Sequence, residues 1–232
     1  MLKKAFHYSI LWLILLVSSC ITLKDDPKPL GNELSEAQLY FLSIAFGTEF
    51  GGASPVIRKW TSEVKIFMAD STYQELNQEL NLVIAELNDL IETISIRRVN
   101  TRAESNLVLY CGNADVFVRD YEPATQNVIK NNFGLFWIYW NNQSELIRGN
   151  VFVDTQRTQG VNCQRHLLRE ELTQSLGIMQ DSGQFSDSIF QQSWTCTNTY
   201  AAVDTMVIKL LYHPLVKPGM SKQQVTAIIQ KL

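Results

Sequence analysis

The stretch REELTQSLGIMQD, residues 169–181, has the pattern of an amphipathic helix that stops at a glycine. Together with the residues just upstream it places four leucines on one side of a helix, namely Leu167, Leu168, Leu172 and Leu176. Gly177 follows directly, at the position where helices commonly end. The sequence therefore predicts a helix from Cys163 to Leu176 that buries its leucine side and turns its polar side to solvent or to a cleft.

Polar residues recur along the other side of this helix. His166, Glu170 and Gln174 are spaced four apart and share a face, where a histidine and a carboxylate can in principle hold a metal ion. Gln174 is a poor zinc ligand, because zinc favours imidazole nitrogen in such sites. The alternative is an ordinary polar face on which Arg165 and Arg169 make only exposed ion pairs, worth roughly a few tenths of a kcal/mol.

The segment resembles the active-site helix of the metzincin zinc proteases, whose motif reads H-E-x-x-H-x-x-G-x-x-H. In such a motif the histidines bind zinc and the glutamate is the general base. With Gly177 as the shared glycine, the ligand positions hold Glu170, Gln174 and Gln180, and the base position holds Glu171. The resemblance implies a zincin-like domain whose zinc ligands are replaced. No metal is therefore expected, and the alternative is zinc or another divalent metal held by His166 and Glu170.

Two further segments extend this resemblance. SDSIF, residues 186–190, lies where metzincins have a turn ending in methionine, and YAAVDTMVIKLLYHP, residues 200–214, resembles a helix near their C-terminus. The chain is similar over longer stretches to the DUF2927 family of bacterial exported proteins, as seen in REELTQSLGIMQDSGQFSDSIF (169–190) and KLLYHPLVKPGMS (209–221). That family brings no known activity, so the resemblance implies a fold rather than a function.

The remaining elements are typical of an α/β layer. A helix is expected over 33–50, ending at Gly51 and Gly52, and a strand over 64–70. A capping box of Ser71 and Gln74 starts the longest predicted helix, whose apolar residues recur at spacings of three and four as far as Ile94. Strands are then predicted at 94–99, 106–111, 116–118, 134–140 and 149–155.

The last two predicted strands differ in pattern. GLFWIYW, residues 134–140, is apolar on both faces, like a strand inside a sheet, whereas GNVFVDT, residues 149–155, alternates like a half-exposed edge strand. Helices over 200–214 and 221–232 complete the domain. The expected fold class is α/β (α+β), a zincin-like mixed twisted sheet with a long backing helix, an active-site-type helix and C-terminal helices.

The N-terminus has the features of an export signal. Lys3 and Lys4 precede an apolar run over 10–17 that is too short to cross a bilayer. Val17-Ser18-Ser19-Cys20 resembles the bacterial lipobox, which implies cleavage before Cys20 and lipidation of that residue; an ordinary signal peptide or an uncleaved anchor is the alternative. We expect a lipoprotein signal peptide (1–19), a lipid-anchored flexible tether (20–32) and a single zincin-like domain (33–232) in the cell envelope, on the periplasmic side or the cell surface.

The net charge and the cysteines indicate which ligands to exclude and which disulfide to expect. The net charge of -3 and the absence of a basic stripe give no reason to expect nucleic acid. Outside the cytosol a disulfide is permitted, and Cys163 and Cys196, which flank the segment of interest, form the favoured pair. Cys111, within an apolar run, is expected to be free and buried.

Two functional hypotheses remain. The first is a non-catalytic module that binds a peptide or an envelope protein by strand addition at an edge strand over 150–154. The second is a noncanonical metallohydrolase or peptidase that uses His166, Glu170 and Glu171, with Glu171 as a possible base even without metal. The residues expected to line its cleft are His166, Glu170, Gln174, Gln180, Asp181 and Ser188. A triad of Ser188 and Asp187 with His166 is disfavoured, because no G-x-S-x-G turn is present.

Overall fold

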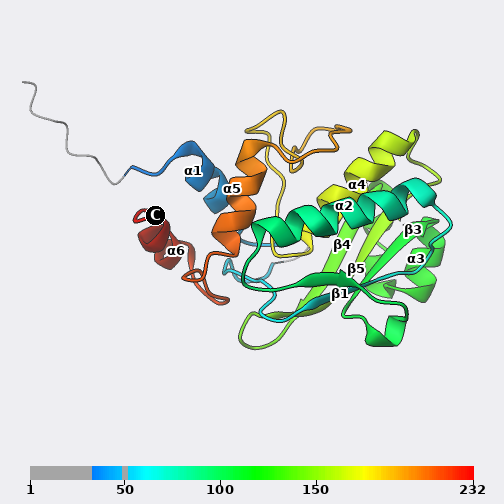
Figure 1. Cartoon of the computed structure of the whole chain (residues 1–232), viewed down its shortest axis with the longest axis horizontal. Coiled ribbons are helices and arrows are strands. Elements are labelled where there is room, and N and C mark those ends of the chain that lie inside the picture. Colours follow the sequence, from blue (N-terminus) through cyan, green and yellow to red (C-terminus); the bar gives the residue numbers. More distant parts are fainter. Residues whose placement is uncertain (1–32, 49–51) are drawn as a thin grey trace, which may run out of the picture. The chain divides into compact units, whose positions relative to one another are not determined.

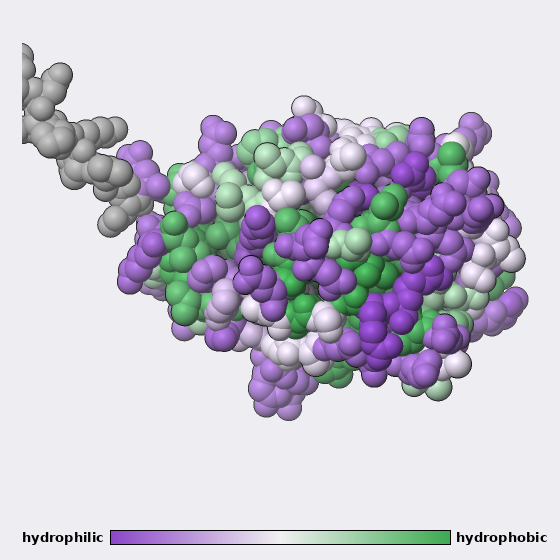
Figure 2. Space-filling model, in the orientation of Figure 1, coloured by the Kyte–Doolittle hydropathy of each residue, from purple (hydrophilic) through white to green (hydrophobic). Residues whose placement is uncertain are grey.

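The computed structural model describes residues 33–48 and 52–232. The predicted signal peptide (1–19), the lipidation site at Cys20 and the tether (20–32) lie outside the described residues, as does Gly51. Within the two described ranges, no helix is both long and apolar enough to span a membrane. Figure 2 shows hydrophilic residues over most of the visible face, with hydrophobic residues in smaller areas between them.

A mixed sheet, with five strands among the described residues, forms the centre of the domain (Figure 1). In spatial order the strands are β2 (Ile96–Arg98), β1 (Val64–Met68), β3 (Leu107–Gly112), β5 (Leu146–Asp154) and β4 (Gly134–Trp140). The first four are parallel, and β4 pairs with β5 in the antiparallel direction. β3, with the sequence LVLYCG, is buried at every residue because both faces of the sheet are covered. The predicted mixed α/β class is confirmed.

Helices cover both faces of this sheet. On one face α2 (Gln74–Leu90) and α4 (Val161–Gln174) lie side by side (Figure 1). On the other face Phe117 of α3 (Ala114–Asp120) packs against Phe152 of β5, with ring centroids 4.9 Å apart, and against Tyr110 of β3. Three short 3-10 turns complete the connections: η1 (Arg102–Glu104), η2 (Pro123–Thr125) and η3 (Ile129–Asn131).

Three further helices, α1 (Glu36–Ile44), α5 (Ala202–Leu211) and α6 (Lys222–Ile229), lie toward one end of the described domain (Figure 1). A buried hydrogen-bond network joins two of them. The hydroxyl groups of Tyr40 in α1 and Ser188 lie 2.9 Å apart, and Ser188 donates to the carboxylate of Asp204 in α5 at 2.5 Å. Asp204 also accepts from the backbone N–H groups of Ile189 and Ala201, so its carboxylate fixes the loop over 186–190.

The prediction of the sheet edge was wrong. β5 was expected at the edge, but it lies between β3 and β4, and its residues 149–154 are all buried. β4, which was expected inside the sheet, is instead an edge strand, and β2 lies at the other edge of the described sheet. The error has a physical reason: an edge strand exposes backbone groups along one side, whereas both of its side-chain faces can still be covered by helices. Apolar residues on both faces therefore did not reveal the edge.

Three local predictions also need correction. Residues 116–118 belong to α3 rather than to a strand, because the Asn113 side chain accepts hydrogen bonds from the N–H groups of Asp115 and Val116 and starts a helix there. α2 begins after Tyr73 without the Ser71 capping box, since Asp70 forms a turn with Thr72 instead. The first helix covers only Glu36–Ile44 of the predicted 33–50.

We predict that Gly177→Ala destabilises the domain by about 3 kcal/mol or more. Gly177 has a φ of +125°, and a Cβ atom there would lie 2.1 Å from the carbonyl oxygen of Arg58. Gly160→Ala is the matched control, because its φ is +85° but no atom lies within 4 Å of the added Cβ; it should cost less than Gly177→Ala, since only backbone strain remains. Urea unfolding of both variants measures the difference, and equal losses would contradict the predicted clash.

Candidate functional site

A polar cleft of about 330 Å³ lies between α4 and two loops of the chain. Its lining residues come from the segment that leads into β4 (Asn131, Asn132, Phe133, Gly134), from α4 (His166, Leu167, Glu170, Glu171, Gln174) and from the chain after α4 (Asp181, Gln191, Gln192, Ser193, Trp194, Thr195). The structure thus brings together five of the residues named from the sequence: His166, Glu170, Glu171, Gln174 and Asp181.

His166 and Glu170 form a contact pair on the cleft side of α4. The imidazole Nε2 lies 3.3 Å from Glu170 Oε2, as the spacing of four residues on a helix predicts. The other ring nitrogen, Nδ1, lies 2.7 Å from the carbonyl oxygen of Thr197 and therefore carries a proton that it donates to that oxygen. The Thr195 hydroxyl is 3.3 Å from Nε2. The imidazole is thus oriented through both of its nitrogens.

This pair holds its protons more tightly than isolated side chains do. Burial raises the pKa of Glu170 from 4.5 to about 7, because desolvation of the carboxylate outweighs the stabilising effect of His166. Burial alone would lower the pKa of His166, but the hydrogen bond and negative charge of Glu170 and the carbonyl of Thr197 raise it above its ordinary value. A carboxylate that titrates near neutral pH is therefore present in the cleft.

Gln174 and Asp181 form a second polar pair beside the first. The Gln174 side-chain amide donates to Asp181 Oδ1 at 2.7 Å. Although Asp181 is exposed as a residue, its carboxylate lies among protein atoms of the cleft, and this desolvation raises its pKa above the ordinary value. The amide of Gln174 is therefore used to hold Asp181 in the cleft wall.

Glu171 lies between α4 and the start of β4. Its side chain is almost fully buried and contacts the backbone of Gly134 so closely that a Cβ atom at Gly134 would lie 2.5 Å from Glu171 Oε1. A side chain at position 134 would therefore have to displace the Glu171 carboxylate. α4 and the edge strand are in direct contact at this point.

Two predicted cleft residues lie elsewhere. Ser188 is fully buried in the network with Tyr40 and Asp204, so it has no access to His166 in the cleft. Gln180 is exposed and lies beside Gly47, outside the cleft lining. Both corrections follow from the chain path after Gly177, which leads back to α1: the N–H of Gln180 donates to the carbonyl of Ile44.

The residues at the three ligand positions of the metzincin motif do not fit a zinc site. Glu170 is engaged with His166, Gln174 with Asp181, and Gln180 lies outside the cleft. Structural and catalytic zinc sites instead use at least three nitrogen, sulfur or carboxylate ligands that converge. In the part of the chain that the structure describes, no group of three His, Cys, Asp or Glu side chains is arranged to hold a metal ion.

The face of α4 that turns away from the cleft carries a buried ionic network, which corrects the expectation of exposed ion pairs. Arg169 is only 2% exposed, and its guanidinium donates to Glu79 at 2.7 Å and also to Glu86, both on α2. The ring of Tyr200 lies 4.7 Å from the guanidinium carbon. Arg165 adds a second bond to Glu79 at 2.7 Å. These contacts attach α4 to α2 along its length.

A disulfide and two aromatic rings form the outer wall of the cleft. Cys163 in the first turn of α4 is bonded to Cys196, while Cys111 is buried and free. The bond holds the chain over 194–197 beside His166, and Trp194 reaches across to Phe133, with ring centroids 5.3 Å apart. Neither aromatic residue was predicted from the sequence, although the cysteine pairing was a usable signal for the position of Trp194.

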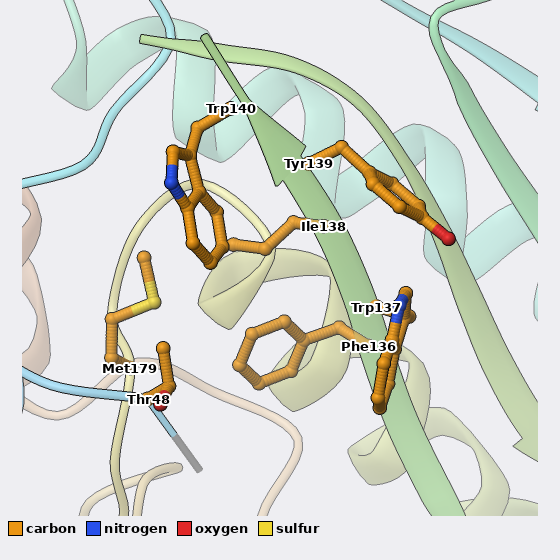
Figure 3. A pocket seen from close by; sticks show the side chains of 7 residues that line it. All are labelled: Thr48, Phe136, Trp137, Ile138, Tyr139, Trp140 and Met179. Atoms are coloured by element: carbon orange, nitrogen blue, oxygen red, sulfur yellow. The ribbon is translucent and has the colours of Figure 1, made fainter. Parts of the chain in front are cut away.

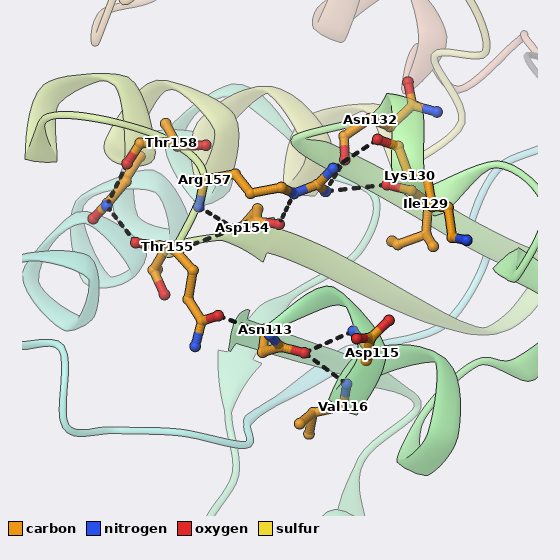
Figure 4. Close-up of polar contacts among 12 residues, drawn as sticks. Asn113, Asp115, Val116, Ile129, Lys130, Asn132, Asp154, Thr155, Arg157 and Thr158 are labelled. Atoms are coloured by element: carbon orange, nitrogen blue, oxygen red, sulfur yellow. Dashed lines mark hydrogen bonds and ion pairs between the residues drawn. The ribbon is translucent and has the colours of Figure 1, made fainter.

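The opposite wall is fixed by Arg157 (Figure 4). Its guanidinium donates to Asp154 at 2.5 Å and to the backbone carbonyl groups of Ile129, Lys130 and Asn132 at 3.1, 2.7 and 2.7 Å. These bonds join the end of β5 to the segment that leads into β4. The position of the cleft wall over 131–134 therefore depends on a single cluster of hydrogen bonds around the partly exposed guanidinium of Arg157.

An apolar pocket of about 260 Å³ lies farther along β4 (Figure 3). Phe136, Ile138 and Trp140 point to the side of the strand on which Met179 and Thr48 lie, whereas Trp137 and Tyr139 point to the other side. The guanidinium of Arg58 covers the Trp140 ring at 4.3 Å. The polar cleft at the start of β4 and the apolar pocket near its end thus follow one another along the same strand.

Comparison with known proteins gives a family but no activity. A family model described as "Protein of unknown function (DUF2927)" matches residues 35–231, a range that includes every residue of the cleft. No match is found among the curated proteins. Among solved structures, "Structure of myroilysin" is similar with a TM-score of 0.41 and 11% sequence identity, covering 67% of this chain and 95% of that chain.

We predict that the free energy of unfolding falls as the pH rises from 5 to 8, and that Glu170→Gln removes much of this dependence. The folded protein binds more protons than the unfolded chain over this range, because the pKa values of Glu170 and His166 are both raised on folding. The rise from 4.5 to about 7 corresponds to at most about 3 kcal/mol. Urea unfolding of the unmodified protein and of the Glu170→Gln variant at pH 5 and pH 8 tests this prediction. An equal fall in the free energy of unfolding for both proteins would contradict it.

Proposed function

Because the chain belongs to the DUF2927 family, whose description leaves its function open, we propose a function from the geometry of its site: the domain binds an extended peptide segment, which adds to the sheet at β4. The observation that carries this proposal is an antiparallel edge strand flanked by a polar cleft and an apolar pocket. Strand addition of this kind takes affinity from backbone hydrogen bonds and specificity from pockets for alternate side chains.

The register of β4 supplies backbone groups for a new strand. The N–H of Asp154 donates to the carbonyl of Phe133 at 2.7 Å, and hydrogen-bonded and non-hydrogen-bonded pairs then alternate along the antiparallel ladder. The backbone groups of Leu135 and Trp137 consequently point to β5. Those that point outward belong to Gly134, Phe136 and Ile138. Among the described residues, none is hydrogen-bonded to these outward groups.

The two cavities supply side-chain contacts along the same edge. The apolar pocket at Phe136, Ile138 and Met179 suits an aliphatic or aromatic side chain. The polar cleft beside Gly134 suits a polar group. Successive same-side residues of an added strand would meet the two cavities in turn, because side chains alternate along an extended chain. A peptide with defined side chains at two positions is therefore the ligand that fits.

The proposal describes a non-catalytic domain, in keeping with the replacement of the zinc ligands at Glu170, Gln174 and Gln180. It also includes the expected place of the protein in the cell envelope, with the membrane reached through lipid on Cys20. This part is supported by the signal-peptide pattern and the lipobox-like Val17-Ser18-Ser19-Cys20 of the sequence. In that setting the partner would be a segment of another envelope protein.

One observation favours a second function, namely hydrolysis by acid–base chemistry. Glu170, with a pKa near neutral pH, lies in contact with His166 inside the cleft. Ionised Glu170 would accept a proton from a water molecule while the water oxygen attacks a peptide carbonyl carbon. Protonated His166 would then give a proton to the departing amine. This reaction uses the two side chains alone.

For strand addition, we predict that Ile138→Pro weakens peptide binding about fivefold more than Ile138→Ala does. Both variants lose the isoleucine side chain, but only proline also removes the outward N–H, and one hydrogen bond contributes about 1 kcal/mol. Proline is tolerated on the solvent side of an edge strand. Binding of blocked octapeptides selected from a synthetic library is measured by fluorescence anisotropy with the full-length chain in detergent. Equal affinities for the two variants would refute strand addition.

For hydrolysis, Glu170→Gln should lower the rate at least about a hundredfold, since the base is lost while the side-chain shape is kept. The control is Glu36→Gln, which changes an exposed carboxylate on α1. Cleavage of a mixture of fluorogenic peptides by the full-length chain is followed by fluorescence. A rate that is zero in the unmodified protein, or unchanged in the Glu170 variant, would eliminate the hydrolytic function.

A further inference from the structure

We propose that the polar cleft binds one neutral sugar ring, through uncharged polar side chains in its walls and an exposed tryptophan at its rim. This inference goes beyond the proposed strand addition and does not require it, because the side chains that carry it belong to the loops around the cleft rather than to β4. It is drawn from the residue types of the lining, from the pairing of the charged groups and from the aromatic rim.

Uncharged polar side chains make up much of the cleft lining. They are Asn131, Asn132, Gln174, Gln191, Gln192, Ser193 and Thr195. A side-chain amide offers both donors and an acceptor, and a hydroxyl group does the same. Asn131, Gln192 and Ser193 are exposed, so their polar groups are accessible to a ligand. Sugar hydroxyl groups also donate and accept, and the lining therefore matches a ligand that carries several of them.

The charged groups of the cleft already have surroundings within the protein. Glu170 contacts His166, and the Gln174 amide donates to Asp181 at 2.7 Å. Glu171 is only 7% exposed. Among the described residues that line the cleft, none is a lysine or an arginine that could bind an anion. Because a charged ligand group loses its hydration and gains no new counter-charge here, a neutral ligand suits the cleft better.

The rim of the cleft presents an aromatic platform. Trp194 lines the cleft and is 57% exposed, and its ring meets that of Phe133 edge to face, with centroids 5.3 Å apart. The face of an aromatic ring is negative and attracts the polarised C–H groups of a sugar ring. Trp194 would thus cover the C–H face of the sugar while the polar side chains bind the hydroxyl groups at its edge. An open-chain polyol lacks this face and fits less well.

This platform is held in place from both sides. Cys196, two residues after Trp194, is bonded to Cys163 at the start of α4. On the other side the guanidinium of Arg157 lies 5.1 Å from the centroid of the Phe133 ring and is bonded to the backbone on either side of η3's end (Figure 4). A preformed surface of this kind loses little conformational freedom when a ligand binds.

The volume of the cleft limits the ligand to a single ring. The cleft holds about 330 Å³, close to the lower end of the range of about 300–1,000 Å³ for small-molecule pockets. A single ring of this kind can stand at the end of a glycan chain or on a glycosylated peptide, and the recognising chemistry is the same in both cases.

The test titrates methyl β-glucoside and methyl N-acetyl-β-glucosaminide against the full-length chain in a detergent without a sugar headgroup, with the NMR signals of the ligand as readout. At least one of the two should bind, and methyl β-glucuronide and glucitol should bind about fivefold more weakly or worse. Trp194→Leu should weaken binding about fivefold, and Trp194→Phe should restore most of it. Gln192→Ala should also weaken binding, whereas Gln223→Ala, which removes an exposed amide from α6, should not.

Three results would refute the sugar site: neither glycoside binds, glucitol binds as well as the glycosides, or Trp194→Leu leaves the affinity unchanged. Ile138→Pro separates this proposal from strand addition, since it should weaken peptide binding and leave glycoside binding intact. Glycoside binding without peptide binding refutes strand addition alone, and the reverse refutes the sugar site alone. Tighter binding of a trisaccharide of N-acetylglucosamine, or of a glycosylated octapeptide, than of the methyl glycoside supports the site and identifies the carrier of the ring.

Discussion

The buried guanidinium of Arg169 determines how α4 lies on the sheet. It is bonded to Glu79 and Glu86 of α2 and lies over the ring of Tyr200, so two carboxylates, that of Glu79 fully buried, balance its charge. Removing one partner of a buried pair of this kind costs about 3–5 kcal/mol. α4 is therefore restricted to the rotation in which Arg169 reaches α2. The same rotation turns the neighbouring face of the helix, with His166, Glu170 and Gln174, into the cleft.

The cleft and the edge strand form one unit because of this placement. Glu171 of α4 fills the space beside Gly134, and the chain after Gly177 carries Met179 to the apolar pocket of β4. Arg157 fixes the segment ahead of β4 from the other side. A single strand thus borders a polar and an apolar cavity, and both cavities are set by contacts within the folded domain.

The sequence predicted the elements better than their arrangement. The leucine spacing around Leu172 predicted α4, and the four-residue separation of His166 and Glu170 predicted their contact. Both predictions depend on local helix geometry alone. The edge position of β4 was missed, since it depends on which strands pair rather than on side-chain pattern. The roles of Phe133 and Trp194 were missed for a similar reason: their contact joins residues that are distant in the chain.

The disulfide between Cys163 and Cys196 determines in which cell compartments the outer wall of the cleft is held in place. Thr195 and Thr197, which contact the two nitrogens of His166, flank Cys196, so one covalent link fixes both the outer wall and the imidazole. Such links form in oxidising surroundings and are rare where thiols are kept reduced. Completion of the cleft is therefore coupled to the redox state of the compartment: the same polypeptide has a tethered wall after oxidation and an untethered one before it.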